Sequence, residues 1–219
     1  MLFRDRSEAG QRLGSQLQEY ANRNDVTVLA LPRGGVPVAF EVARTLRAPL
    51  DVFLVRKLGA PGQEELAMGA VATGGVCVVN PDVVRSLGIS REQLEAVATQ
   101  QIKELQRQEQ SFRGNRESTD VRGHTVILVD DGLATGSTMR AGVIALRQEQ
   151  PRQIVVAVPV ASRSTCAELQ GQADETICLY TPLAFHAVGQ WYQDFSPITD
   201  DQVHQLLDRA AEWTQRPAA

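Results

Sequence analysis

Two adjacent carboxylates, Asp130 and Asp131, follow directly after the apolar run at residues 126–129. Four consecutive branched apolar residues are typical of a fully buried strand. The carboxylates are followed by a loop of small residues, which opens an apolar helix at residues 139–146. Such a loop turns backbone N–H groups, hydroxyls and a helix N-terminus toward one point, where a phosphate can bind. The stretch therefore predicts a ligand with a phosphate at one end and hydroxyls nearby, such as a sugar phosphate.

Three other kinds of site fit this stretch less well. A Walker A loop needs a Lys before its Ser or Thr, and this loop has none. The Gly-x-Gly-x-x-Gly pattern of dinucleotide-binding loops is also absent. A response-regulator receiver would place its acidic pair after the first strand, whereas this pair lies past mid-chain. A solvated turn is the remaining alternative, but crowded carboxylates repel each other and need a partner.

Residues 126–138 resemble the phosphoribosyl-pyrophosphate (PRPP) motif of type I phosphoribosyltransferases, closest to the adenine and orotate branches. The resemblance implies that Asp130 and Asp131 hold the ribose 2- and 3-hydroxyls. It implies that the 5-phosphate is wrapped by the loop residues Ala134, Thr135, Gly136, Ser137 and Thr138. The hypoxanthine-guanine branch carries an Asp where this chain has Ala134, so we expect an acceptor other than a 6-oxopurine.

Two further loops follow predicted strands. Arg33, Gly34 and Gly35 precede a helix, and the resemblance implies a pyrophosphate loop that often carries a non-proline cis peptide bond. The alternative is a helix-entry turn with a surface Arg. Arg56 and Lys57 follow the second strand, where relatives contact pyrophosphate with basic residues; the alternative is an ordinary solvated pair. The next residues, 59–65, read as a mobile loop, in which Glu64 and Glu65 are solvated or paired with Arg or Lys.

Aromatic residues gather near the C-terminus, where type I enzymes carry a small hood over the acceptor base. Phe185, Trp191 and Tyr192 are candidates for stacking on that base. The alternative is that they pin the segment to the core, as aromatics near a chain end commonly do.

The composition is that of an ordinary globular chain. Its 219 residues are 43% hydrophobic and 22% charged, with a formal net charge of −4, which argues against general nucleic-acid or membrane-surface binding. No run of apolar residues approaches membrane-spanning length, and the N-terminus lacks a signal-peptide core. Cys77, Cys166 and Cys178 show neither zinc nor disulfide spacing and are expected to be free thiols in a reducing cytoplasm.

The patterns predict an α/β fold with a doubly wound, mainly parallel five-stranded sheet, a β-hairpin insertion and a small C-terminal hood. Strands are expected at residues 26–31, 50–55, 68–73, 76–80, 126–129, 154–158 and 176–180, and a polar loop at 56–66. Helices are expected at residues 7–23, 36–46, 137–149, 163–170 and 200–213, with a long one after the capping box at 90–93. Residues 1–180 form the core, with the hairpin and long helix inserted at about 67–115, and 181–219 form the hood within the same unit. The fold rule and the resemblance suggest strand order 2-1-3-4-5.

Together these features predict a cytoplasmic, Mg²⁺-dependent phosphoribosyltransferase, a pentosyltransferase of nucleotide metabolism. It would transfer the 5-phosphoribosyl group of PRPP to a small nitrogenous acceptor and release pyrophosphate, with Asp130, Asp131, Arg33, Arg56 and Lys57 as the catalytic set. Mg²⁺ would be carried mainly by PRPP, with the two acids reaching it through water. The alternative is a PRPP-sensing regulatory protein on the same fold. Neither a membrane nor nucleic acid is an expected partner, and a homodimer is left open.

Overall fold

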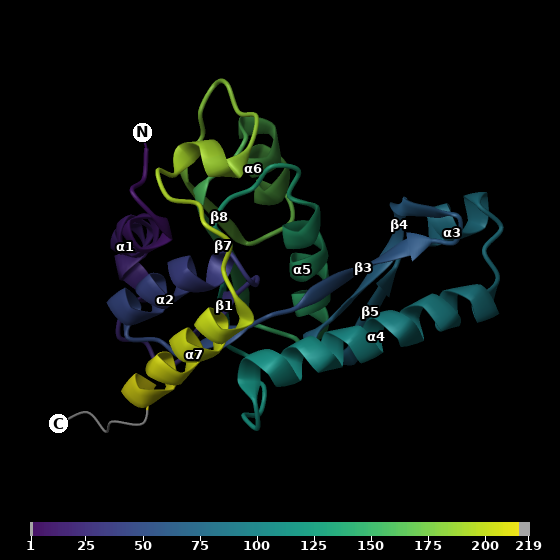
Figure 1. The fold of residues 1–219 in the computed structure, drawn as a ribbon, viewed down its shortest axis with the longest axis horizontal. Helices are drawn as coiled ribbons and strands as arrows, with labels where there is room; N and C mark the ends of the chain where they lie inside the picture. Colours follow the sequence, from purple (N-terminus) through teal and green to yellow (C-terminus); the bar gives the residue numbers. More distant parts are fainter. Residues whose placement is uncertain (1, 215–219) are drawn as a thin grey trace.

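The computed structural model describes residues 2–214, which form a doubly wound α/β core with a long projecting arm (Figure 1). The core sheet has the order β2-β1-β6-β7-β8, and all neighbouring strands are parallel. Its strands are β1 (Val26–Ala30), β2 (Leu50–Val52), β6 (Thr125–Val129), β7 (Gln153–Val160) and β8 (Glu175–Tyr180). The predicted fold class and strand order are confirmed.

Helices cover both faces of this sheet, because alternate residues of the central strands face opposite sides. Val28 and Ile127 face a core shared with α1 (Arg6–Gln16), α2 (Gly35–Leu46) and α7 (Asp200–Thr214). Leu29 and Leu128 face a second core shared with α5 (Ser137–Gln148) and α6 (Arg163–Gln170). Strands that are buried on both sides explain the continuous apolar runs in the sequence.

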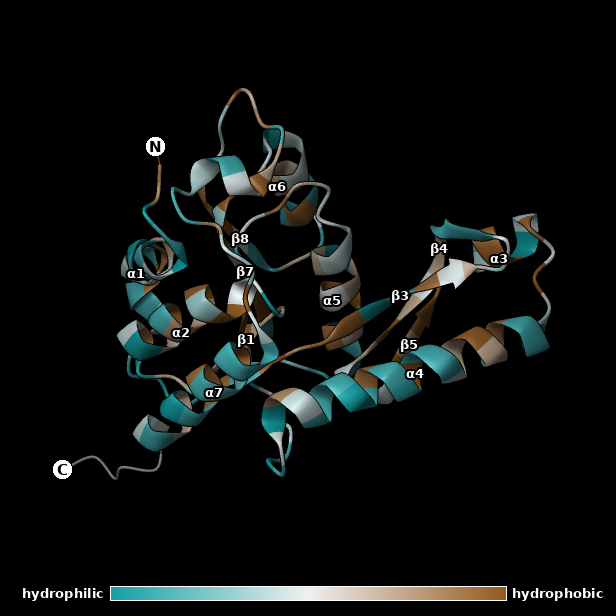
Figure 2. Cartoon of the chain, in the orientation of Figure 1, coloured by the Kyte–Doolittle hydropathy of each residue, from teal (hydrophilic) through white to brown (hydrophobic). Residues whose placement is uncertain are grey.

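The arm consists of an antiparallel sheet, β3 (Val55–Ala60), β4 (Gln63–Ala72) and β5 (Val76–Val79), backed by α4 (Arg91–Arg113). Its tip carries α3 (Pro81–Ser86), and a short turn, η2 (Thr73–Gly75), joins β4 to β5. The capping box at Ser90 and Gln93 is present at the start of α4. Figure 2 shows hydrophilic residues along much of α4 and apolar residues on the strands that it covers.

The predicted polar loop at residues 56–66 is wrong, because β3 and the start of β4 occupy it. Pro61 and Gly62, with Gly62 at φ +76°, form a tight turn between these strands rather than part of a long loop. Leu58 and Met68 are fully buried in the core that includes Leu105 of α4, so the hairpin is held by packing against that helix. Two smaller boundaries also differ: α1 ends at Gln16 and is followed by η1 (Gln18–Tyr20), and β2 ends at Val52.

The segment between β8 and α7 packs against the N-terminal residues. Phe3 pairs with Tyr192 in an isolated parallel bridge, with hydrogen bonds of 2.8 Å from Phe3 N to Trp191 O and from Gln193 N to Phe3 O. A short helix, η3 (Val188–Trp191), precedes this contact. Residues 215–219 of the predicted hood lie outside the described residues, and the division at residue 180 stays a prediction.

The expectation of free thiols is wrong for two of the three cysteines. Cys166 of α6 and Cys178 of β8 form a disulfide, with 6.5 Å between their Cα atoms. The sequence spacing did not reveal this pair because it arises from the packing of α6 on the edge strand. Cys77 is free and exposed. Within the described chain, no helix is long and apolar enough to cross a membrane.

Candidate active site

Two loops meet at the carboxyl ends of the neighbouring strands β1 and β6, which is where ligands bind in open parallel sheets. Leu31 N donates to Val129 O at 2.9 Å. A Cβ at Gly34 would lie 2.1 Å from Oδ2 of Asp131, and one at Gly35 would lie 2.8 Å from Val129 O. Both positions therefore require glycine, and the predicted pyrophosphate loop lies directly against the predicted sugar-binding acids.

The two acids are partly buried, and the pKa of each carboxyl is raised. Burial, with a further contribution from the charge of Asp131, raises the pKa of the Asp130 carboxyl well above its usual range. Burial also raises the pKa of Asp131, while Arg6 opposes that rise. Asp131 N donates to Oδ1 of Asp130 at 2.8 Å, and Arg6 Nε donates to Oδ2 of Asp131 at 2.8 Å. Crowded carboxylates of this kind are typical of functional sites.

Arg6 contacts the predicted site, although the sequence did not indicate it. Its Nη1 donates to Ser196 O at 2.9 Å, and its guanidinium carbon lies 3.9 Å from the centre of the Phe195 ring. Tyr192 donates from its hydroxyl to Asp131 O at 2.5 Å, and burial raises the pKa of that hydroxyl. No local signal marks Arg6, since a basic residue in the first turn of a helix reads as a surface residue.

The predicted phosphate loop is anchored to β7 and α6 on one side. Leu133 N donates to Val160 O at 2.9 Å, and Thr165 donates from its hydroxyl to Ala134 O at 2.7 Å. Gly136 has φ +68° and is the N-cap of α5, so the chain turns there in a conformation that favours glycine. The remaining loop residues that we expected at the phosphate, Ala134, Thr135, Ser137 and Thr138, are exposed at the start of this helix. The hydroxyls of Thr135, Ser137 and Thr138 and the N–H groups at the helix N-terminus are donors of the kind that bind a phosphate.

A second cation lies beside this loop and was also missed. Arg140 donates to Oε2 of Glu168 at 2.9 Å and lies 3.5 Å from the hydroxyl oxygen of Ser137. Its position three residues after Ser137 on a predicted helix was the available signal, because such neighbours share one helix face.

Of the three cations predicted to contact pyrophosphate, Arg33 lines a cavity and the other two do not. Arg33 lines a cavity of about 250 Å³ together with Pro32, Gln108 and Thr138, and pairs with Asp200 at 3.0 Å. The peptide bond between Pro32 and Arg33 is cis, as the resemblance implied.

The other two predicted cations lie on the arm. Arg56 donates to Gln101 at 2.8 Å and to Gln108 at 3.1 Å. Gln108 lines the cavity, whereas Arg56 is not among the lining residues. Lys57 pairs with Glu65 across the hairpin at 3.2 Å and is not part of the cavity lining. That ion pair is one of the arrangements expected for the glutamates.

The predicted acceptor aromatics pack against the core. The Tyr192 ring centre lies 5.4 Å from that of Phe3, and the Trp191 ring meets Tyr180 edge-on at 5.2 Å. Phe185 is partly buried in the same small cluster. This packing matches the pinning alternative, and a role in base stacking stays a prediction.

The donor set fits Mg²⁺ only as an ion brought by a ligand. Among the described residues, no three His, Cys, Asp or Glu side chains gather where they could hold a metal. Mg²⁺ is commonly held by one or two carboxylates, substrate phosphates and water. Asp130 and Asp131 supply the hard oxygens for that arrangement, and nothing in the described chain forms a cage.

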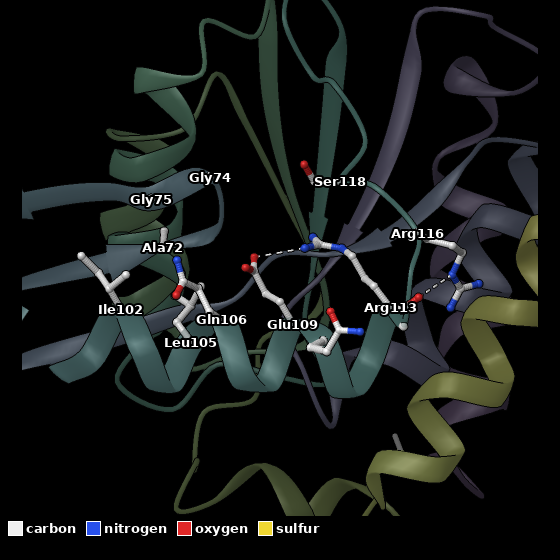
Figure 3. A pocket seen from close by; sticks show the side chains of 12 residues that line it. Ala72, Gly74, Gly75, Ile102, Leu105, Gln106, Glu109, Arg113, Arg116 and Ser118 are labelled. Carbon is white, nitrogen blue, oxygen red and sulfur yellow. Dashed lines mark hydrogen bonds and ion pairs between the residues drawn. The ribbon is translucent and has the colours of Figure 1, made fainter. Parts of the chain in front are cut away.

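A different cavity, of about 480 Å³, lies between η2 and α4 (Figure 3). Its two arginines are already paired: Arg113 with Glu109 at 3.0 Å and with Asp51 at 2.8 Å, and Arg116 with Asp208 at 2.9 Å. These contacts fix the end of α4 to the core, so the cavity offers little free charge to an anion.

A family model described as "Phosphoribosyl transferase domain" matches residues 5–189. The chain belongs to this family, and its fold is that of the type I phosphoribosyltransferases; the adenine or orotate branch stays a prediction. It is similar to two proteins of Mycobacterium tuberculosis, from strains CDC 1551 / Oshkosh and ATCC 25618 / H37Rv, each named "Putative phosphoribosyl transferase". Each is 47% identical over 209 residues, which are 95% of this chain and 47% of the relative. The chain thus spans about half the length of these curated relatives.

A solved structure is similar over nearly the whole chain. The crystal structure of TT1426 from Thermus thermophilus has a TM-score of 0.86 and 45% sequence identity. The match covers 97% of this chain and 99% of that one. The core and the arm together are therefore shared with this Thermus protein.

Proposed function

We propose that this chain binds PRPP and transfers its 5-phosphoribosyl group to a nitrogenous acceptor, releasing pyrophosphate. The observation that carries the proposal is the contact between the two loops: Gly34 lies against the carboxylate of Asp131, beside the exposed start of α5. The two loops offer acceptors for sugar hydroxyls and donors for a phosphate, and Arg33, in a cavity that Thr138 also lines, offers a cation for pyrophosphate.

The chemistry proposed is substitution at the anomeric carbon, where positive charge develops as the bond to pyrophosphate breaks. Arg33 would offset the negative charge that grows on the leaving group, and Arg56 and Lys57 would join it through movement of the arm. The amides and hydroxyls at the start of α5 would bind the 5-phosphate and orient the sugar. Mg²⁺, when brought with PRPP, would neutralise phosphate charge as a Lewis acid. The described residues provide no evident covalent nucleophile or general base.

A PRPP-sensing role is the second candidate, and one observation favours it. Lys57 pairs with Glu65 on the arm and is not among the residues that line the cavity beside Arg33. A protein that binds PRPP without turnover would need the loops but not Lys57.

The location in the cytoplasm and the part in nucleotide metabolism belong to the proposal as well. The disulfide between Cys166 and Cys178 removes the argument that free thiols gave for a reducing compartment.

A test follows PRPP binding and pyrophosphate release separately. Calorimetry with PRPP and Mg²⁺ reports binding, and a pyrophosphate assay across nucleobases and other ring or exocyclic nitrogens reports turnover. Binding with acceptor-dependent release supports the enzyme, and binding without release for every acceptor supports the sensor. Absence of PRPP binding would remove both candidates.

A further inference from the structure

Each carboxylate of the acidic pair has one oxygen bound by the protein and one left over. Oδ1 of Asp130 accepts from Asp131 N, and Oδ2 of Asp131 accepts from Arg6, both at 2.8 Å. Within residues 2–214, no hydrogen bond reaches Oδ2 of Asp130 or Oδ1 of Asp131. Both residues are intermediate in burial, and the Asp131 side chain is 13% exposed. The pair therefore presents two acceptors from neighbouring residues.

The Asp131 carboxylate is held between Arg6 and Gly34. A Cβ at Gly34 would lie 2.1 Å from Oδ2 but 3.3 Å from Oδ1. Oδ2 thus points toward the protein, and the guanidinium of Arg6 holds it there. A diol that approaches the pair meets Oδ1.

Arg6 is itself held from two further sides. Its Nη1 donates to Ser196 O at 2.9 Å, and its guanidinium stacks at 3.9 Å on Phe195. The Arg6 side chain is only 9% exposed. A planar guanidinium can serve two acceptors in fixed directions, whereas an ammonium group acts as a point charge. Arg6 is therefore suited to fixing an orientation as well as supplying charge.

We infer that Arg6 is a positioning residue of this site, which turns Asp131 so that the acidic pair presents one free oxygen each to the vicinal hydroxyls of a pentose phosphate. The inference rests on the proposed function and adds a link to it: the N-terminal helix and the segment at residues 195–196 together set the sugar-binding geometry. Two rival roles exist for the same contact. Arg6 could serve the fold alone, or it could block Asp131 until a ligand displaces it.

The test compares two ligands that differ only in the hydroxyls. Ribose 5-phosphate and 2,3-dideoxyribose 5-phosphate are titrated by calorimetry into the parent, Arg6→Gln, Arg6→Lys and the control Arg12→Gln. Arg12 lies on the same helix and pairs with Glu8 at 2.6 Å, away from the acids. The ratio of the two dissociation constants measures what the hydroxyls contribute, because phosphate binding cancels.

We expect a ratio of at least about tenfold in the parent, as hydrogen bonds to charged groups provide. Arg6→Gln should reduce the ratio about tenfold while the dideoxy ligand keeps its affinity within about twofold. Arg6→Lys should give an intermediate ratio, and Arg12→Gln should match the parent. A fold-only role would weaken both ligands equally and leave the ratio unchanged.

The outcomes separate this inference from the proposed function. A parent ratio near one would remove the proposed sugar-binding role of the acids. A high parent ratio that Arg6→Gln preserves, or tighter binding of ribose 5-phosphate to that variant, would overturn the positioning role alone. If Arg6→Gln does not fold, Arg6→Lys decides, and a parent-like ratio in it overturns the inference.

Discussion

Gly34 and Asp131 are packed so closely that a methyl group at position 34 would lie 2.1 Å from Oδ2 of the carboxylate. Heavy atoms do not approach this closely, so one of the two loops must move if a side chain is added. The loop at Arg33–Gly35 and the acidic pair therefore behave as one unit, although almost 100 residues of sequence separate them.

Gly34→Ala should weaken PRPP binding by about 10- to 100-fold, because it displaces the Asp131 carboxylate and removes a charge-assisted hydrogen bond of about 1.5–3 kcal/mol. Calorimetric titration with PRPP measures this effect. Gly171→Ala is a matched control, since a Cβ there would meet only Glu168 O, at 3.6 Å. Parent-like affinity in Gly34→Ala would show that the two loops are not coupled.

Much of this unit could be predicted from the sequence. The order apolar run, paired acids, small-residue loop and apolar helix is local, so residues 126–138 indicated a strand, a ligand loop and a helix N-terminus together. The loop at Arg33–Gly35 could be predicted in the same way, because it lies between an apolar strand and a helix. Parallel strands then bring such loops to one edge, and the order β2-β1-β6 makes them neighbours.

The parts that could not be predicted depend on distant contacts. Arg6 meets Asp131 across 125 residues, and Cys166 meets Cys178 through the packing of α6 on β8. The hairpin at residues 55–72 was hidden because Gly59, Pro61 and Gly62 read as a loop, whereas its stability comes from packing on α4. The residues of a segment do not by themselves indicate which distant element the segment will pack against.

Replacing both acids, Asp130→Asn with Asp131→Asn, should weaken PRPP binding more strongly than Asp131→Asn alone. Each neutral amide replaces a charged acceptor, and each lost charge-assisted bond costs about 1.5–3 kcal/mol. Calorimetry on folded variants provides the measurement, with pyrophosphate alone as a ligand that lacks the sugar. Unchanged PRPP affinity in the double variant would remove the assignment of the pair to the sugar.

Arg33→Ala and Lys57→Ala should lower turnover more than they weaken PRPP binding. Both residues are in exposed ion pairs, whose net stability is about 0–1 kcal/mol, so exchanging their partners for pyrophosphate is inexpensive. Negative charge on pyrophosphate rises as the bond to the sugar breaks, so these cations act mainly in the transition state.

Steady-state kinetics with an identified acceptor would show about a 100-fold lower kcat for these variants. Arg91→Ala, on the exposed face of α4, is the control. A rise in KM for PRPP with kcat unchanged would assign these residues to binding alone.

Asp130→Asn should make the protein more stable at neutral pH. Burial and the charge of Asp131 raise the pKa of Asp130 in the folded state, so the folded chain holds this proton more tightly than the unfolded chain. The associated stability is complete below the ordinary value of 3.8 and is lost as the pH rises through the raised pKa. An amide does not ionise, and its oxygen can still accept from Asp131 N.

Thermal unfolding between pH 3 and pH 8 measures this difference. A gain of 1 kcal/mol corresponds to about 2–4 °C in Tm for a chain of this size. We expect the Tm of the variant to exceed that of the parent by about 2–4 °C at pH 7, and the two Tm values to converge toward pH 3. A parent that is equally or more stable at neutral pH would show that Asp130 ionises without cost.

The buried ion pair between Asp51 and Arg113 should contribute strongly to stability. The two side chains meet at 2.8 Å and are 9% and 7% exposed, and Arg113 also donates to Val52 O at 2.5 Å. Asp51 accepts from Thr119 N at 3.0 Å, so the pair joins β2, the end of α4 and the connector to β6. Removing one member leaves the other charge buried without its partner.

Arg113→Met should therefore lower the free energy of unfolding by about 3–5 kcal/mol. Asp51→Leu with Arg113→Met should cost less, because the more buried carboxylate is removed as well and only Glu109, which is 19% exposed, loses its partner. Urea unfolding of the parent, the single variant and the double variant provides the comparison. Arg91→Met, which breaks an exposed pair with Glu95, should change stability by less than about 1 kcal/mol. A cost below about 1 kcal/mol for Arg113→Met would show that α4 is anchored to the core by its apolar contacts instead.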